Sequence, residues 1–210
     1  MTKTLPLLAI ALLSALLAWV TFVWNPAGEN PEGHQRIALE GRPRGGDFQL
    51  TSVDGPVSLS DLRGKLVLLY FGYTACPDIC PTNLAILALA LRALTPDERK
   101  RVQVVFVSVD PERDGLERLA EYAAYFHPSI IGVTGTEREV AAAAAQYGAA
   151  YQRSEQPGSA MGYLVDHSAN TYLIDPAGAL VNVLDHATPS EEIVATLRRH
   201  LPPPARPSDE

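Results

Sequence analysis

The chain has 210 residues, of which 47% are hydrophobic and 7% aromatic. This composition allows an ordinary hydrophobic core in one soluble domain of about 150 residues, with accessory segments. The formal net charge is −7 and the basic residues form no long block, so the composition argues against a nucleic-acid partner.

The N-terminal segment 5–24 carries no charge and follows Lys3. It ends among aromatic side chains, Trp19, Phe22 and Trp24. An apolar stretch of about 20 residues with such a border is typical of a transmembrane helix. We therefore predict a single-pass anchor over residues 5–24, with residues 1–4 in the cytoplasm by the positive-inside rule. The alternative is a cleaved signal peptide, but the stretch is long for one, and no A-x-A-like site follows at the right distance.

In a bacterium, this orientation places the globular part on the periplasmic side of the inner membrane. Residues 25–46 are rich in Gly, Pro and charge and are predicted to form a tether; residues 202–210 are predicted to form a disordered tail. The domain is expected over residues 47–201. Because this compartment is oxidising, a lone pair of cysteines there would by default form a structural disulfide.

The first half of the domain has the pattern of a hairpin followed by a β-α-β unit. Residues 48–51 and 57–59 flank an Asp-Gly turn signal. Residues 66–71 are an unbroken apolar run, typical of a central strand buried on both faces. Apolar residues at helical spacing follow over 84–94, and a second apolar strand is predicted over 102–109.

The second half alternates helices and strands and then closes with a hairpin and a helix. The predicted elements are a helix over 115–126, a strand over 130–133, a helix over 136–147, paired strands over 170–174 and 180–184, and a helix over 190–201. Their order and lengths indicate a thioredoxin-like α/β sandwich. Chemistry on open α/β sheets gathers at the carboxyl ends of parallel strands, which is where Cys76 and Cys80 fall.

Cys76 and Cys80 are the two cysteines of the chain and lie in the run CPDICP over residues 76–81. Because Pro81 lacks an amide hydrogen and is tolerated in a first helical turn, we predict Cys80 at the N-cap and Cys76 on the preceding loop. The positive end of the helix dipole favours both thiolates, whereas the carboxylate of Asp78 opposes them.

This pair of thiols has three interpretations. It can close as a disulfide if the two α-carbons come within about 7 Å. Reduced, it offers two soft ligands for Cu(I), or for Zn(II) with further ligands. A purely structural staple is the third, although a bridge across so short a loop stabilises little.

A metal needs a third ligand, and His167 is the best candidate because it directly precedes the predicted strand 170–174, in a loop expected to fold back toward the cysteines. A neutral imidazole there completes an S₂N set suited to Cu(I) and, with Asp166 or water, to Cu(II). The alternative is a surface histidine that merely precedes a strand. The remaining candidates are interpreted as non-ligands: His34, His127, His186, His200 and Met161.

A polar cluster over residues 110–114 follows the second core strand and should neighbour the cysteine loop. Asp114 at the start of the next helix favours a capping role. A docking role toward a partner protein is the alternative.

Three blocks together resemble the Sco/SenC family of membrane-anchored copper proteins. They are residues 72–81 (GYTACPDICP), residues 109–114 (VDPERD), and Asp166-His167 ahead of residues 172–176 (YLIDP). The resemblance covers roughly residues 48–201. It implies a thioredoxin-like domain that binds copper through Cys76, Cys80 and His167 and serves assembly of the binuclear copper site of cytochrome c oxidase. The residues 151–162 offer little that matches.

Two functions remain open at this stage. The first is copper delivery without turnover chemistry, with the copper-site subunit of the oxidase as partner and another periplasmic copper chaperone or a thiol reductant upstream. The second is an enzyme, a thiol-disulfide reductase in which Cys76 attacks and Cys80 resolves, so that the oxidase's copper-binding thiols stay reduced. A peroxiredoxin-like peroxidase fits poorly, because Thr74 stands two residues before Cys76 and not three.

Overall fold

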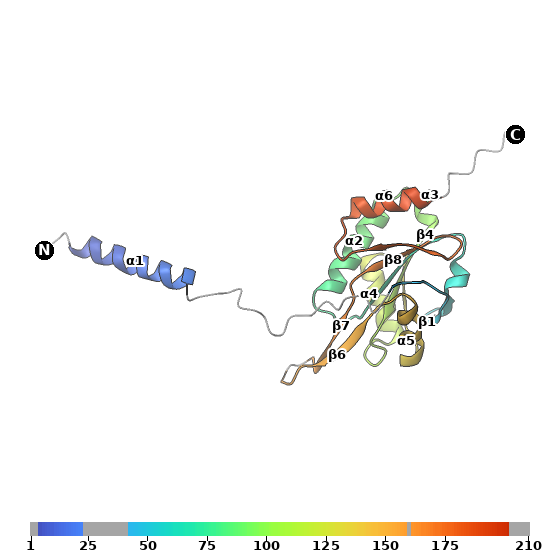
Figure 1. Cartoon of the computed structure of the whole chain (residues 1–210), viewed down its shortest axis with the longest axis horizontal. Coiled ribbons are helices and arrows are strands. Elements are labelled where there is room, and N and C mark those ends of the chain that lie inside the picture. The colour runs from blue at the N-terminus through green and yellow to red at the C-terminus, as the bar shows by residue number, and fades with distance from the viewer. Residues whose placement is uncertain (1–3, 23–41, 159–160, 202–210) are drawn as a thin grey trace. The chain divides into compact units, whose positions relative to one another are not determined.

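A computed structural model describes residues 4–22, 42–158 and 161–201 (Figure 1). The chain separates into two units, Met1–Gly33 and His34–Glu210. The predicted tail, His34 and most of the predicted tether lie outside the described residues. The last residues of that tether belong to the fold, because the amides of Arg44 and Gly45 both donate to the carbonyl oxygen of Gln146, at 3.1 and 3.0 Å.

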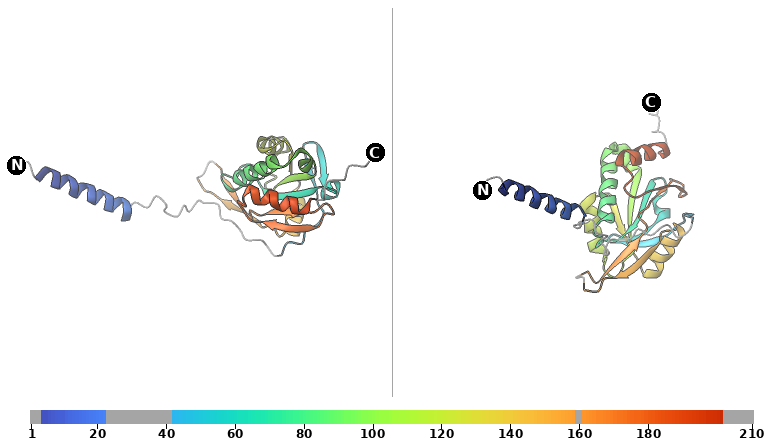
Figure 2. Two further views of the ribbon diagram at one scale, coloured as in Figure 1. Left: turned by 90° about the horizontal axis from the view of Figure 1, so that it is seen from above. Right: turned by 60° about the vertical axis from the view of Figure 1, so that its left-hand side comes forward.

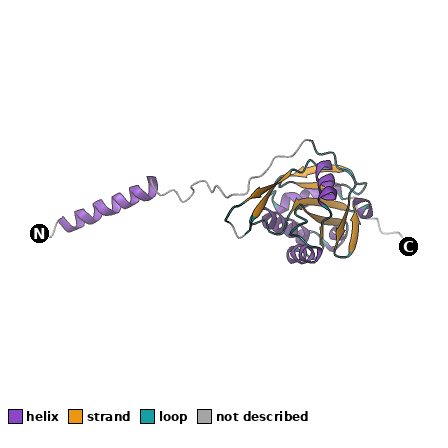
Figure 3. Ribbon diagram, turned by 90° about the horizontal axis from the view of Figure 1, so that it is seen from below, coloured by secondary structure: helices purple, strands orange, loops and turns teal. Residues whose placement is uncertain are grey.

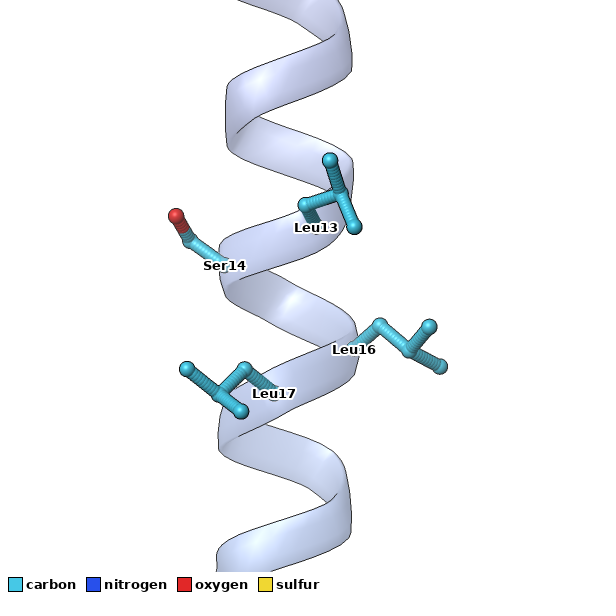
Figure 4. A pocket seen from close by; sticks show the side chains of 4 residues that line it. All are labelled: Leu13, Ser14, Leu16 and Leu17. Carbon is cyan, nitrogen blue, oxygen red and sulfur yellow. The ribbon is translucent and has the colours of Figure 1, made fainter.

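The first unit contains helix α1, Thr4–Phe22, formed by a run of leucine and alanine with high helix propensity. Figure 4 shows Leu13, Leu16 and Leu17 projecting from its turns, and all three are exposed. Within the described residues, no helix combines the length and apolar character that crossing a membrane requires. The predicted transmembrane helix is therefore not confirmed.

The second unit is built around a five-stranded sheet with the order β5-β4-β3-β8-β9. Strands β3 (Leu66–Gly72), β4 (Val102–Ser108) and β5 (Ile130–Val133) are parallel, and β8 (Thr171–Ile174) and β9 (Leu180–Leu184) continue the sheet antiparallel. Every residue of β3 and β4 is buried. This burial explains the unbroken apolar runs that predicted both strands.

Helices pack around this sheet, as Figure 3 shows. Their bounds are α2 (Ile79–Ala93), α3 (Pro96–Lys100), α4 (Leu116–Phe126), α5 (Glu137–Gln146) and α6 (Ser190–His200). Helix α2 packs beside α6 (Figure 2), and α4 packs against β5. The helices α3 and α5 both begin with a complete capping box, at Thr95 and Thr136.

Two small antiparallel ribbons complete the fold. Strands β1 (Gln49–Ser52) and β2 (Gly55–Ser58) form the predicted hairpin and lead into a short 3-10 helix, η1 (Leu59–Leu62). Strands β6 (Tyr151–Glu155) and β7 (Tyr163–His167) form a second ribbon, which the sequence did not predict. Figures 1 and 2 show this β6–β7 ribbon at the edge of the domain.

Candidate metal centre

The cysteines lie where the central sheet meets its first helix. Cys76 is on the loop that follows β3, and Cys80 is the second residue of α2, whose N-cap is Asp78. The predicted N-cap position of Cys80 is therefore wrong by two residues, because the helix already begins at Ile79. Pro81 occupies the third helical position, where an amide hydrogen has no intrahelical partner in any case.

The two sulfur atoms lie close together at the N-terminus of α2. Both cysteines are free thiols and both are buried, with 5% of Cys76 and 0% of Cys80 exposed. The backbone amide of Cys80 donates to Sγ of Cys76 at 3.3 Å. Amides at a helix N-terminus are suited to hydrogen-bond a thiolate. The role of Cys76 as the attacking thiol stays a prediction. The disulfide between them stays a prediction.

The imidazole of His167 reaches this pair from the other end of the chain. Its Nε2 lies 3.2 Å from Sγ of Cys80, and the side chain is fully buried. Its Nδ1 lies 3.0 Å from the carbonyl oxygen of Ser168, which can only accept a hydrogen bond, so the proton belongs on Nδ1. The lone pair of Nε2 consequently faces the sulfur atoms, as metal binding requires.

His167 is the last residue of β7, and this corrects its predicted position in a loop before a strand. It pairs with Tyr151 across the β6–β7 ribbon. Side chains alternate along a strand, so Asp166, predicted as an additional ligand, points to the opposite face. Asp166 is not part of the group that the three side chains form.

Cys76, Cys80 and His167 form one compact donor set. Their ligand atoms all lie within 4.8 Å of one another. Metal ions bind thiolate sulfur at about 2.3 Å and imidazole nitrogen at about 2.0 Å, so two ligand atoms on one ion are separated by at most roughly 4.6 Å. Only a small adjustment therefore separates the described geometry from a bound ion.

The chemistry of this set favours a soft ion. Two thiolates and one imidazole suit Cu(I), whereas a closed zinc site needs four ligands. Among the residues described, this is the one group of at least three His, Cys, Asp or Glu side chains whose ligand atoms lie close enough together to hold a metal ion. His127 instead contacts Ser129, and His200 contacts the carbonyl oxygen of Thr196. The structure thus separates these two histidines from the site.

Burial governs the chemistry of Cys80. Desolvation, together with the neighbouring sulfur of Cys76, raises the pKa of the Cys80 thiol well above its usual value. The hydroxyl of Tyr70 donates to Sγ of Cys80 at 3.7 Å, and this contact opposes the rise in pKa only in part. Metal binding at Cys80 must therefore displace a proton.

Gly72, the last residue of β3, makes room for the Cys80 sulfur. A methyl group at this position would lie 2.6 Å from Sγ of Cys80 and 2.9 Å from the ring of Phe106. Real Cβ atoms essentially never approach so closely, and a buried strand has no room to shift. Gly72 therefore leaves the space that the Cys80 sulfur occupies.

A buried carboxylate fixes the cysteine loop. Asp114 accepts from the amide of Thr74 at 2.9 Å, from the hydroxyl of Thr74 at 2.5 Å and from the hydroxyl of Ser108 at 2.6 Å. It does not cap α4, whose N-cap is Gly115, so the predicted capping role is wrong. Thr74 was missed as a functional residue. The sequence contained a signal for this contact. The carboxyl ends of neighbouring parallel strands lie at the same edge of a sheet, so a carboxylate that follows β4 should meet the loop that follows β3.

Comparisons with known proteins agree with this architecture. The family model described as SCO1/SenC matches residues 38–202. The mitochondrial protein SCO2 homolog of Mus musculus is 38% identical over 199 residues, which cover 93% of this chain and 78% of the mouse protein.

Two solved structures have a closely similar fold. The apo Sco1 protein of Thermus thermophilus is 42% identical, with a TM-score of 0.68, covering 80% of this chain and 98% of that chain. Arabidopsis thaliana ScoI with copper bound is 38% identical, with a TM-score of 0.67, covering 75% and 97%. These neighbours confirm the predicted thioredoxin-like α/β fold, and the chain belongs to the SCO1/SenC family.

Proposed function

We propose that this protein binds copper through Cys76, Cys80 and His167 and delivers it to the binuclear copper site of cytochrome c oxidase during assembly of that enzyme. The observation that carries the proposal is the buried donor set itself. Two sulfur atoms and one nitrogen, from segments 87 residues apart, lie within bonding range of a single ion. Membership of the SCO1/SenC family and the copper-bound Arabidopsis relative support the choice of metal.

Copper is the cargo in this function. The thiolates of Cys76 and Cys80 supply soft ligands, and Nε2 of His167 supplies the third. Because Cys76 is the more exposed of the two cysteines, incoming thiols of the oxidase subunit exchange first at this side. Two thiols must be deprotonated for copper to bind, and an oxidised pair has none to offer, so loading requires prior reduction.

The proposal includes attachment to a membrane. Residues 5–24 act as the anchor and hold the domain at the periplasmic face of the inner membrane, beside the copper-site subunit of the oxidase. The support is the uncharged segment between Lys3 and the aromatic residues that end it. On the same side of the membrane, a periplasmic copper chaperone supplies the copper or a thiol reductant supplies the electrons that reduce the cysteine pair.

The amide contact at Cys76 favours a second candidate, thiol-disulfide reduction. The Cys76 thiolate attacks a substrate disulfide and forms a mixed disulfide, releasing one substrate thiolate. Cys80 then loses its proton and attacks the Cys76 sulfur, which releases the second substrate thiolate and leaves an internal disulfide. A periplasmic thiol reductant returns the two electrons. The high pKa of the Cys80 thiol slows the second step.

Replacing His167 by Ala separates the two functions, because reduction needs no imidazole. Copper affinity, measured by competition with a chelator, should fall by more than about 100-fold. Loss of a residue that only supports a ligand costs about 10- to 100-fold, and His167 is itself a proposed ligand. Reduction of a model disulfide should survive.

The matched control for this change is His200→Ala, because His200 bonds within α6 and is not part of the donor set. It should leave copper affinity unchanged. Copper binding at the parent affinity in His167→Ala would contradict the ligand assignment and leave the redox function.

A further inference from the structure

The histidine of the site is carried by an element that the central sheet does not hold. The β6–β7 ribbon is a separate two-stranded sheet, and β7 pairs with β6 alone among the described strands. The cysteines, in contrast, follow directly from β3 at the centre of the five-stranded sheet. No ladder joins β7 itself to the central sheet, so side-chain contacts contribute to the distance between His167 and the sulfur atoms.

Arg113, on the loop after β4, makes these contacts to the backbone of the ribbon. Its Nη1 donates to the carbonyl oxygen of Tyr163 at 3.0 Å and to that of Met161 at 3.3 Å. Its Nε donates to Asp110 at 2.5 Å, and this carboxylate is buried. A guanidinium with donors in a rigid fork can serve a carboxylate and two carbonyl groups at once.

The side chain of Tyr163 closes the same cluster. Its hydroxyl donates to the other oxygen of Asp110 at 2.8 Å, and the guanidinium carbon of Arg113 lies 3.6 Å from the centre of its ring. Asp110, Arg113 and Tyr163 thus form a closed set of hydrogen bonds and a cation–π contact. In such surroundings, with little water, polar contacts are stronger than at the surface.

Arg113 also faces the cysteine side of the site. Its guanidinium carbon lies 5.5 Å from the ring centre of Tyr73, the residue three positions before Cys76. The hydroxyl of Tyr73 accepts from the amide of Val165 in β7 at 3.2 Å, and its ring meets the His167 ring edge-on. Arg113 therefore packs between the segment that leads to the cysteines and the strand that carries the histidine.

We propose that Arg113 is the positioning residue of the metal site, and that it sets the distance of His167 from the two cysteine sulfurs by holding β7 through the carbonyl groups at its start. The metal-binding part of this statement rests on the function proposed above. The effect on the strand does not, because it concerns the copper-free protein.

The test replaces Arg113 by Gln in the full chain. We expect faster hydrogen exchange at the amides of β7 in the copper-free protein, with the exchange of β3 and β4 unchanged. Copper affinity should fall by about 10- to 100-fold, the usual cost of losing an outer-shell partner. In a His167→Ala background the same change should cause no further loss, because Arg113 acts through that histidine.

Arg153→Gln is the matched control. Its guanidinium carbon lies 3.5 Å from the same Tyr163 ring, but its hydrogen bonds go to Glu112 and Glu155 and to no carbonyl group of β7. This variant should keep both the slow exchange of β7 and the parent affinity. Arg113→Lys should recover only part of the affinity, because a single ammonium group cannot replace the fork.

Three results would overturn the proposal. They are parent affinity in Arg113→Gln, equal loss of affinity with and without His167, and unchanged exchange in β7. If His167→Ala alone leaves copper affinity intact, the proposed function fails, yet the exchange of β7 still decides whether Arg113 holds the strand. If Arg113→Gln also speeds exchange throughout β3 and β4, the arginine supports the whole fold and its specific role is refuted.

Discussion

The two sides of the candidate metal centre are held in different ways. The cysteine side, residues 72–80, is fixed by the central strand β3, the first turn of α2 and the buried carboxylate of Asp114. The histidine side, β7, belongs to a two-stranded ribbon and is held by side-chain contacts from the loop after β4. The cysteine side is therefore anchored directly to the central sheet, whereas β7 has no ladder to that sheet and depends more on side-chain contacts.

This difference predicts that disturbing the cysteine side affects both stability and metal binding. Disturbing the histidine side should affect mainly metal binding. Gly72→Ala and Asp114→Asn test the first half of this statement, and the change at Arg113 tests the second. Glu98→Gln tests whether the packing of α6 against α2 also supports the cysteine side.

The largest effect is expected from Gly72→Ala. The added methyl group would lie 2.6 Å from Sγ of Cys80, so the sulfur or the strand must move. Overpacking of this kind costs about 1–3 kcal/mol, and urea unfolding should show a loss near the upper end. Copper affinity should fall as well, because the displaced atom is a proposed ligand.

Gly115→Ala is the control for this change. An added Cβ at Gly115 meets no atom within 4 Å, so any loss of stability there reflects only the poorer preference of alanine for the N-cap. A Gly72→Ala variant that is as stable as Gly115→Ala and keeps the parent copper affinity would show that the Cys80 sulfur does not need the space left by Gly72.

A smaller effect is expected from Asp114→Asn. The amide group keeps one acceptor but turns a donor toward the groups that now donate to the carboxylate, those of Thr74 and Ser108. Leaving a buried donor unsatisfied should lower stability by about 1 to 2 kcal/mol. The cysteine loop should loosen, and the reduction potential of the cysteine pair should shift.

The reduction potential separates the two sides of the site. Asp114→Asn should shift it more than Arg113→Gln, because Asp114 binds the cysteine loop directly, whereas Arg113 reaches that loop only through the ring of Tyr73. Equal shifts in both variants would remove the distinction between the cysteine side and the histidine side. Asp97→Asn, an exposed carboxylate, serves as the control for the loss of charge.

The difference between the cysteine side and the histidine side also explains which parts of this site the sequence predicted. The unbroken apolar run of β3 and the CPDICP motif are local patterns, so they predicted the strand and the thiol pair and placed the helix start within two residues. The contacts of β7 with the rest of the site come from residues far apart in the chain, such as Arg113 and Tyr163. The polar run of β6 has no periodicity that predicts the ribbon. The role of Asp114 was misjudged for a related reason, since capping is a local rule whereas its partner Thr74 is 40 residues away.

The smallest effect is expected from Glu98→Gln, which tests whether the position of α6 affects the cysteine side through its packing beside α2. Glu98 binds Arg198 of α6 through both oxygens, at 2.8 and 3.1 Å, and α6 packs beside α2, the helix of Cys80. Hydrogen bonds from Arg198 and from the amide of Thr95 lower the pKa of Glu98 to about 2. Because half of the Arg198 side chain is exposed, against 19% of Glu98, solvent screens the pair, and its loss should cost less than about 1 kcal/mol.

The pH dependence identifies the origin of this small loss. A lowered pKa stabilises the folded protein above the usual value of 4.5, and this contribution disappears as the pH falls through about 2. The difference in unfolding free energy between parent and Glu98→Gln should therefore be full at pH 7 and absent near pH 2. Copper affinity should not change, because β3 and Asp114 hold the cysteine loop without α6; a lower affinity in this variant would mean that the sulfur positions depend on the α2–α6 packing as well as on the sheet.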